Sequence, residues 1–100
     1  MELSDYRARI DQIDRQLVEL FAQRMNTAAG IAAYKKEHGL PVLDPVRERE
    51  KLLDVAAQAP EDMRDYTASL YTMLFELSRC YQGRLLGSTC LLYTSPSPRD

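Results

Sequence analysis

The feature that most constrains the fold is the stretch from Ser4 to Glu37, which contains no proline and a single glycine, Gly30. Apolar residues recur along it in steps of three and four, the spacing of one face of an α-helix. Such a helix, beginning at Ser4 as N-cap, is about 50 Å long. Because a compact 100-residue chain has a radius of gyration of only about 13 Å, one protomer cannot cover it. We therefore predict an intertwined homodimer with long helices side by side; a helix kinked at Gly30 within a three-helix monomer is the alternative.

Two further helices are expected after a break at His38-Gly39-Leu40-Pro41. A second helix would begin with Asp44 as N-cap and Pro45 in the first helical position, and end near Ala59. A third would open at Pro60-Glu61-Asp62 and account for the chain as far as residue 86. Its apolar face comprises Leu70, Tyr71, Leu74, Phe75, Leu77, Tyr81 and Leu85. No strand pattern competes, so the expected fold class is all-α, with three helices per chain.

The last residues differ in composition from the rest. From residue 87 the chain reads GSTCLLYTSPSPRD, where helical periodicity stops and Ser, Thr and Pro dominate. We expect a helical domain over residues 1–86 and a disordered tail over 87–100. The string CLLYTSPSPRD resembles translated sequencing-adapter text, which implies that the natural protein continued past Leu86.

Composition excludes several classes of partner. The net charge is -2, with 13 basic residues interleaved among 15 acidic ones, so nucleic acid and anionic membrane surfaces are not expected partners. No apolar run approaches the roughly 20 residues of a membrane span, and the N-terminus does not read as a leader, which favours the cytoplasm. Cys80 and Cys90 lack metal-type spacing and are expected to be free thiols.

Two cations interrupt the apolar stripe of the first helix. The stripe runs through Tyr6, Ile10, Ile13, Leu17, Leu20, Arg24, Ala28, Ile31 and Lys35. A buried cation is costly without a carboxylate, so Arg24 and Lys35 need either an acidic side chain or an anionic ligand. Their Cα atoms would lie about 16 Å apart on one face, which allows two extended side chains to bracket a small anion. The structural alternatives are an ion pair for Arg24 and a solvent-reaching ammonium for Lys35.

Polar residues on the other two helices extend this set. Asp44, Arg47 and Glu48 cluster in the first turn of the second helix, and Ser78 and Gln82 lie one turn apart on the inner face of the third. The ordinary alternatives are an N-cap, a solvated turn and a serine bonded to its own backbone. The set contains no catalytic triad, phosphate loop or metal cluster. It favours catalysis by positioning and electrostatics, without metal or cofactor.

Arg7 repeats the pattern of a charge beside the apolar stripe at the other end of the first helix. It lies 17 residues before Arg24, or about 25 Å along the axis, too far for both to reach one small ligand. If Arg7 is functional, it serves the partner's site, which again calls for a dimer.

These residues together resemble the all-helical, AroQ-type chorismate mutases from residue 3 to about residue 86. The motifs are Arg7-x-x-Ile10-x-x-x-Asp14-x-x-Leu17, Arg24, Lys35, the block PVLDPVRER from Pro41 to Arg49, and Ser78-x-x-x-Gln82. Each motif alone is weak, but their order and spacing are specific. The resemblance implies an intertwined dimer of three-helix chains without a cofactor. It also implies an isomerase that converts chorismate to prephenate, on the shikimate pathway toward phenylalanine and tyrosine.

The resemblance also implies a role for each site residue. Arg24 and the partner's Arg7 would bind the substrate carboxylates, and Lys35 and Gln82 would contact the ether oxygen. Glu48, with the Asp44 region, would hold the ring hydroxyl, while Arg47 and Ser78 complete the pocket. Members of this family are often fused to another enzyme of the pathway, and a prephenate dehydratase is the C-terminal domain we expect to have been lost here.

Two other functions remain open from the sequence. An isochorismate pyruvate lyase of the same fold would use similar cations, although the Asp44-Arg47-Glu48 block fits the mutase better. The chain could also be a non-catalytic dimerisation or regulatory module of a larger enzyme. A purely structural module has no use for cations within its apolar stripe, which argues against that alternative.

Overall fold

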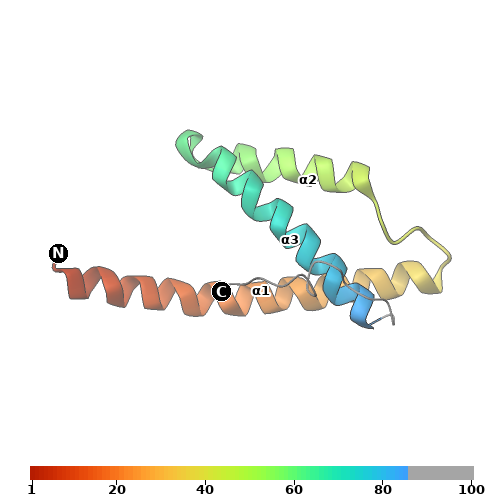
Figure 1. Ribbon diagram of the computed structural model, residues 1–100, viewed down its shortest axis with the longest axis horizontal. Coiled ribbons are helices and arrows are strands. Elements are labelled where there is room, and N and C mark those ends of the chain that lie inside the picture. The colour runs from red at the N-terminus through yellow and green to blue at the C-terminus, as the bar shows by residue number, and fades with distance from the viewer. Residues whose placement is uncertain (86–100) are drawn as a thin grey trace, which may run out of the picture.

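The computed structural model describes residues 1–85, which form three α-helices and a 3-10 turn (Figure 1). The elements are α1 (Leu3–Glu37), α2 (Pro45–Gln58), η1 (Glu61–Met63) and α3 (Arg64–Leu85). Helix α3 packs against both α1 and α2, and it crosses α1 in the C-terminal half of that helix. This arrangement confirms the all-α prediction with three helices per chain, while the predicted tail over 87–100 lies outside the described residues.

Helix α1 runs through Gly30 without interruption, so the kinked alternative is wrong. The helix begins at Leu3, and its N-cap is Glu2, two residues before the N-cap Ser4 that we predicted. The carboxylate of Asp5 accepts a hydrogen bond from the Glu2 N–H at 3.0 Å, which satisfies a donor at the helix start. At the other end Gly39 has φ of 69°, the left-handed conformation that suits glycine after a helix.

The later helices begin largely where the sequence predicts. Asp44 caps α2, since its Oδ1 accepts from the Arg47 N–H at 3.0 Å, and Pro45 occupies the first helical position. The third helix opens with the 3-10 turn η1 and becomes regular only at Arg64. On α3 the predicted apolar residues Tyr71, Leu74, Phe75, Leu77 and Tyr81 are half-buried, but Leu70 is 53% exposed in the single chain.

One chain supplies little hydrophobic core. Within residues 1–85 the buried side chains are Ala32, Val55 and Ser78, one from each helix. The molecule measures 54 × 33 × 23 Å, and its radius of gyration of 16.5 Å exceeds the roughly 13 Å of a compact 100-residue chain. The N-terminal half of α1 extends beyond the other helices as a free arm (Figure 1).

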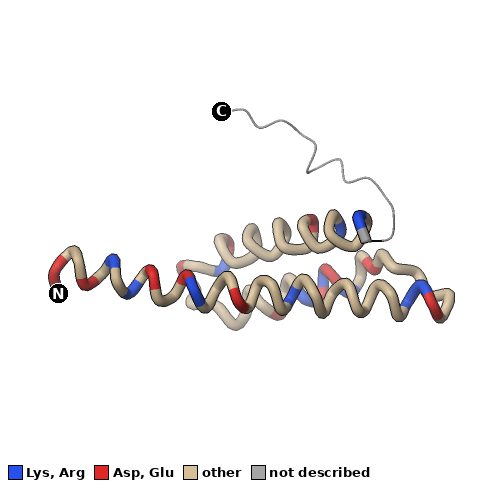
Figure 2. The backbone as a smooth tube through the Cα atoms, turned by 90° about the horizontal axis from the view of Figure 1, so that it is seen from below, with Lys and Arg blue, Asp and Glu red and all other residues tan. Residues whose placement is uncertain are grey.

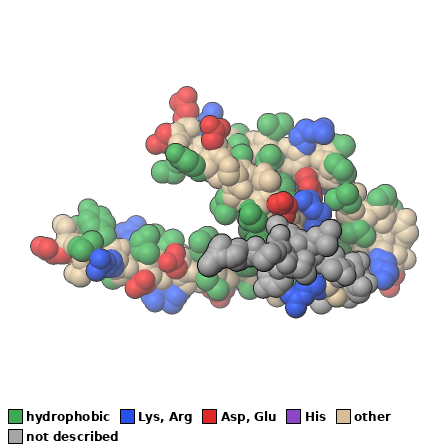
Figure 3. All heavy atoms as spheres, viewed as in Figure 1, with side chains coloured by type: hydrophobic (Ala, Val, Ile, Leu, Met, Phe, Trp, Pro, Cys, Tyr) green, Lys and Arg blue, Asp and Glu red, His purple; other side chains and the backbone are tan. Residues whose placement is uncertain are grey.

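The surface of that arm is both charged and apolar. Acidic and basic residues are interspersed along α1 rather than forming a stretch of one sign (Figure 2). Hydrophobic side chains lie between them along the arm (Figure 3). The large exposed ones on this half of α1 are Leu3, Tyr6, Ile10, Ile13, Leu17, Val18 and Leu20.

Two expectations about the chain's chemistry can be compared with the structure. Cys80 is disulfide-bonded, so the prediction of a free thiol is wrong for this residue; Cys90 lies outside the described part. Over residues 1–85 none of the helices has the length and apolarity needed to cross a membrane.

Candidate active site

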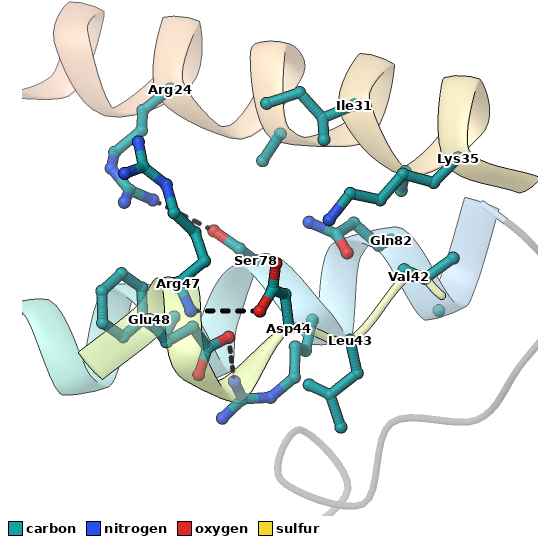
Figure 4. Close-up of a pocket in the computed structure, with 15 residues that line it drawn as sticks. Arg24, Ile31, Lys35, Val42, Leu43, Asp44, Arg47, Glu48, Ser78 and Gln82 are labelled. Carbon is teal, nitrogen blue, oxygen red and sulfur yellow. Dashed lines mark hydrogen bonds and ion pairs between the residues drawn. The ribbon is translucent and has the colours of Figure 1, made fainter. Parts of the chain in front are cut away.

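A cavity of about 520 Å³ lies where the C-terminal half of α1, the start of α2 and the C-terminal half of α3 meet (Figure 4). The loop before α2 contributes Val42 and Leu43 to its wall. Seven of the eight residues predicted for the site line it. They are Arg24, Lys35, Asp44, Arg47, Glu48, Ser78 and Gln82.

The cations of α1 enter the cavity from one helix face, as their spacing predicts. Arg24 and Arg47 place their guanidinium groups at one end, while Lys35 and Gln82 point toward one another at the other end (Figure 4). Ile31 lies between Arg24 and Lys35 on the α1 wall and is 53% exposed, so this wall is open to solvent in a single chain. The two ends of the cavity therefore offer separate groups of hydrogen-bond donors.

Three side chains of α3 contact Arg24. Its Nη1 donates to the Ser78 hydroxyl at 3.3 Å, and its guanidinium carbon lies 5.5 Å from the ring centroid of Tyr71 and 5.6 Å from that of Phe75. Both distances fall within the range of cation–π attraction. Ser78 is 6% exposed and its hydroxyl also donates to Met25 Sδ at 3.6 Å, so the alternative of a serine bonded to its own backbone is wrong.

The start of α2 supplies both acids of the site. Asp44 uses one carboxylate oxygen as the cap of the helix, so the N-cap alternative is confirmed whatever else the residue does. Glu48, one turn later, is joined at 2.6 Å to Nη1 of Arg79 on α3 (Figure 4). The first turn of α2 is thereby fixed to α3 across the cavity.

The cavity carries a surplus of positive charge. Four cations (Arg24, Lys35, Arg47 and Arg79) face two carboxylates, Asp44 and Glu48, which leaves a net charge of +2. Within residues 1–85, Arg24, Lys35 and Arg47 form no ion pair with a carboxylate, so the ion-pair alternative for Arg24 is wrong there. Unpaired cations that converge on a hollow create a site for an anion, and a charge of +2 matches a dicarboxylate.

The described residues of the cavity wall contain neither a Ser-His-Asp triad nor a cluster of three or more metal-ligating side chains. Among the lining residues of the part of the chain that the structure describes, the one hydroxyl belongs to Ser78, which is engaged with Arg24, and there is neither histidine nor cysteine. A cavity of this kind can bind, orient and stabilise negative charge.

Comparison with known proteins identifies the family. The family model for chorismate mutase type II matches residues 6–83, which include all the described residues of the cavity wall. The chain belongs to this family. Its all-α architecture agrees with the family assignment.

Curated relatives of this chorismate mutase type II chain are similar over shorter segments. The chorismate mutase of Methanocaldococcus jannaschii is 38% identical over 48 residues, which cover 48% of each chain. The T-protein of Haemophilus influenzae is 44% identical over 46 residues, 46% of this chain and 12% of the relative. The bifunctional chorismate mutase/prephenate dehydratase of Buchnera aphidicola subsp. Schizaphis graminum is 29% identical over 92 residues, 89% of this chain and 24% of the relative.

The chain thus spans about half, or less, of the length of the curated relatives it matches. No solved structure matches it significantly.

Arg7 is the one predicted residue of the chorismate mutase site that lies elsewhere. It belongs to the free arm of α1, in a shallow hollow with Ser4 and Asp11. A second hollow of about 460 Å³ adjoins the main cavity, shares Arg24 and Glu48 with it, and continues along α1 toward Leu20. The site is therefore open on the side from which the arm extends.

Sequence reasoning missed three residues of the site. Phe75 and Arg79 line the cavity, and the ring of Tyr71 contacts the Arg24 guanidinium group. Phe75 and Arg79 had a detectable signal, because with Ser78 and Gln82 they form a 3-1-3 spacing that places all four on one helix face. From the sequence, Phe75 was placed only on the apolar face of the third helix, and Arg79 was not identified as a site residue.

Proposed function

We propose that this chain is a chorismate mutase that converts chorismate to prephenate by intramolecular rearrangement. The observation that carries the proposal is the convergence of Arg24, Lys35 and Arg47, none of them ion-paired within residues 1–85, on one cavity with the neutral donor Gln82. The substrate is a dianion, and the cavity has a net charge of +2. Membership of the chorismate mutase type II family supports the same reaction.

The reaction needs no group that the cavity lacks. In the rearrangement the ether C–O bond breaks as a new C–C bond forms within the same molecule, without proton transfer or a covalent intermediate. The protein has to hold the compact reactive conformer and stabilise the negative charge that grows on the ether oxygen. Lys35 and Gln82, which point toward one another, are suited to donate to that oxygen (Figure 4).

The remaining polar residues would bind the rest of the substrate. We assign one carboxylate to Arg24, with Arg47 and Ser78 completing that end of the cavity. Glu48, together with the Asp44 region, would accept from the ring hydroxyl. Support comes from the placement of all these residues on the cavity wall.

A homodimer would complete the site. The arm of α1 exposes an apolar stripe, including Leu17 at 58% and Ile10 at 53%, that no other part of residues 1–85 covers. We propose that a second copy covers it and contributes Arg7 to the cavity through the side open beside Leu20. Two chains would also supply the core that one chain lacks.

The natural protein would extend further. We propose that this module precedes a prephenate dehydratase domain, supported by the similarity over 89% of this chain to a bifunctional chorismate mutase/prephenate dehydratase. The cytoplasmic location expected from the sequence stays a prediction.

The first test follows chorismate loss by absorbance and prephenate formation by its acid-catalysed conversion to phenylpyruvate. Arg24→Ala and Lys35→Ala should each lower kcat/KM by at least about a hundredfold, since each removes a charged contact to the reacting substrate. Arg15→Ala and Lys36→Ala are matched controls, because both cations are exposed on α1 outside the cavity. Their activity should stay within about twofold of wild type.

Three outcomes would contradict the proposal. Turnover of isochorismate to pyruvate without turnover of chorismate would establish the lyase. A folded dimer that neither turns over chorismate nor binds a bicyclic transition-state mimic would indicate a non-catalytic module. Equal losses in Arg24→Ala and Arg15→Ala would show that the reaction occurs elsewhere.

A further inference from the structure

Arg79 is the cation of the cavity that neither the sequence motifs nor the proposed mechanism explains. It projects from α3 into the cavity, and its Nη1 lies 2.6 Å from a carboxylate oxygen of Glu48 on α2. This is the ion pair that joins two different helices among residues 1–85; the other, between Lys51 and Asp54, lies within α2. The pair therefore connects the α2 and α3 walls of the cavity at Glu48, the acid that we propose binds the ligand.

Stability gives little reason for this pair. The Arg79 side chain is 42% exposed and that of Glu48 32%. Exposed ion pairs contribute little to folding because water and salt screen them. A role in the cavity explains the contact better, because Glu48 places a negative charge in a site that has to accept a dianion.

We propose that Arg79 is a positioning residue that holds the Glu48 carboxylate in the orientation required to accept from the substrate's ring hydroxyl. Charge-assisted contact to one oxygen, Oε2, leaves Oε1 available to the ligand. Arg79 also balances the charge of Glu48. Without Arg79 the net charge of the cavity would fall from +2 to +1. This inference rests on the proposed function.

The test is a double-mutant cycle in the full chain, with chorismate as substrate. Arg79→Gln should lower kcat/KM about tenfold in the wild-type background, the size expected for a charged hydrogen bond. In a Glu48→Ala background the same substitution should change kcat/KM by less than about twofold, because the group on which Arg79 acts is gone. Arg79→Lys should retain more activity than Arg79→Gln, since one N–H···O contact requires only a cation at this position.

Arg64→Gln, an exposed cation at the start of α3 outside the cavity, is the matched control and should leave kcat/KM unchanged. Thermal unfolding of each variant reports any loss of folded protein. An Arg79→Gln effect of equal size in both backgrounds would overturn the proposal, because Arg79 would then act on the ligand or on the fold directly. No effect in either background would overturn it as well. Absence of turnover in the wild-type chain would instead refute the proposed function.

Discussion

Arg24 shows how a single residue of the site depends on its neighbours. A guanidinium group on a half-exposed helix has many rotamers, and fixing one of them has an entropic cost. Ser78, Tyr71 and Phe75 restrict Arg24 through a hydrogen bond and two ring contacts without neutralising its charge. An ion pair would have restricted it too, but would have competed with an anionic ligand. The surroundings therefore hold the cation in place and leave it available.

Gln82 provides a prediction about pH at the same scale. An amide donates a hydrogen bond at any pH, so we expect the wild-type rate to persist from about pH 6 to pH 8. A glutamate at this position donates only when protonated, and an ordinary glutamate has a pKa of about 4.3. Gln82→Glu should therefore be much less active at pH 8 and recover as the pH falls.

The measurement is kcat/KM across this range for both proteins, with circular dichroism at each pH to confirm folding. Gln12→Glu, exposed on α1 and outside the main cavity and the hollow that adjoins it, is the matched control and should follow the wild-type profile. A wild-type rate that collapses above pH 6, or a flat profile for Gln82→Glu, would contradict a donor role for Gln82.

At the scale of elements, the first turn of α2 has a structural and a ligand-binding task. Asp44 ends the loop and caps the helix, while Glu48 one turn later faces the cavity and contacts α3. Helix N-termini carry free N–H groups and a partial positive charge, so both acids stabilise the turn that presents them. A substitution here can therefore change stability and activity together.

Asp44 variants should separate these tasks. Asp44→Ala removes the cap and should lower the free energy of unfolding by about 1 kcal/mol, whereas Asp44→Asn retains an acceptor and should stay within a few tenths of a kcal/mol. Both variants lose the carboxylate, so kcat/KM should fall severalfold in each. Asp54→Ala, whose carboxylate forms an exposed ion pair with Lys51, is the control and should change stability by less than about 0.5 kcal/mol.

Urea unfolding at one fixed protein concentration measures these differences, since an oligomer's stability depends on concentration. Equal stability of the alanine and asparagine variants would contradict the capping role. Full activity of Asp44→Asn would remove Asp44 from the substrate contacts.

At the scale of the whole molecule, α1 is too long for the other helices of the same chain to cover it. Its C-terminal half packs on α3 and forms one wall of the cavity, and its N-terminal half extends away from the other helices (Figure 1). Burying apolar surface contributes about 25 cal/mol per Å², so an exposed row of Ile, Leu and Tyr side chains favours association. In a dimer, one continuous apolar stripe on α1 would both pack against α3 of its own chain and form the contact with the second chain.

Leu17→Glu should therefore abolish the dimer. The residue is 58% exposed in the single chain, and a charge placed at the proposed interface would be desolvated. We expect analytical ultracentrifugation to show a monomer and the chorismate mutase rate to fall sharply, because Arg7 of the partner subunit would no longer reach the cavity. Gln12→Glu adds the same charge about 140° around the helix and should leave mass and rate unchanged. A dimeric Leu17→Glu protein, or a monomeric wild type, would contradict this interface.

Most of the architecture could be predicted from local signals. The stripe of α1, the Asp44-Pro45 start of α2 and the glycine after α1 each act over a few residues, and each lies where the sequence indicates. The helix start at Leu3 was missed because Ser4 was preferred as N-cap over the weaker cap Glu2. Asp5, three residues after Glu2, completes a capping box by accepting a hydrogen bond from the Glu2 N–H.

For the site, the sequence by itself determined which residues face inward. Helical spacing places Arg24 and Lys35 on one face, and Ser78 and Gln82 on another, because side-chain direction along a helix follows from position alone. Only the tertiary structure decided what these faces meet. Ser78 holds Arg24, two aromatic rings support the same cation, and Arg79 contacts Glu48, all across separations of more than 30 residues along the chain. Such contacts depend on how α3 crosses α1 and α2, which no local pattern specifies.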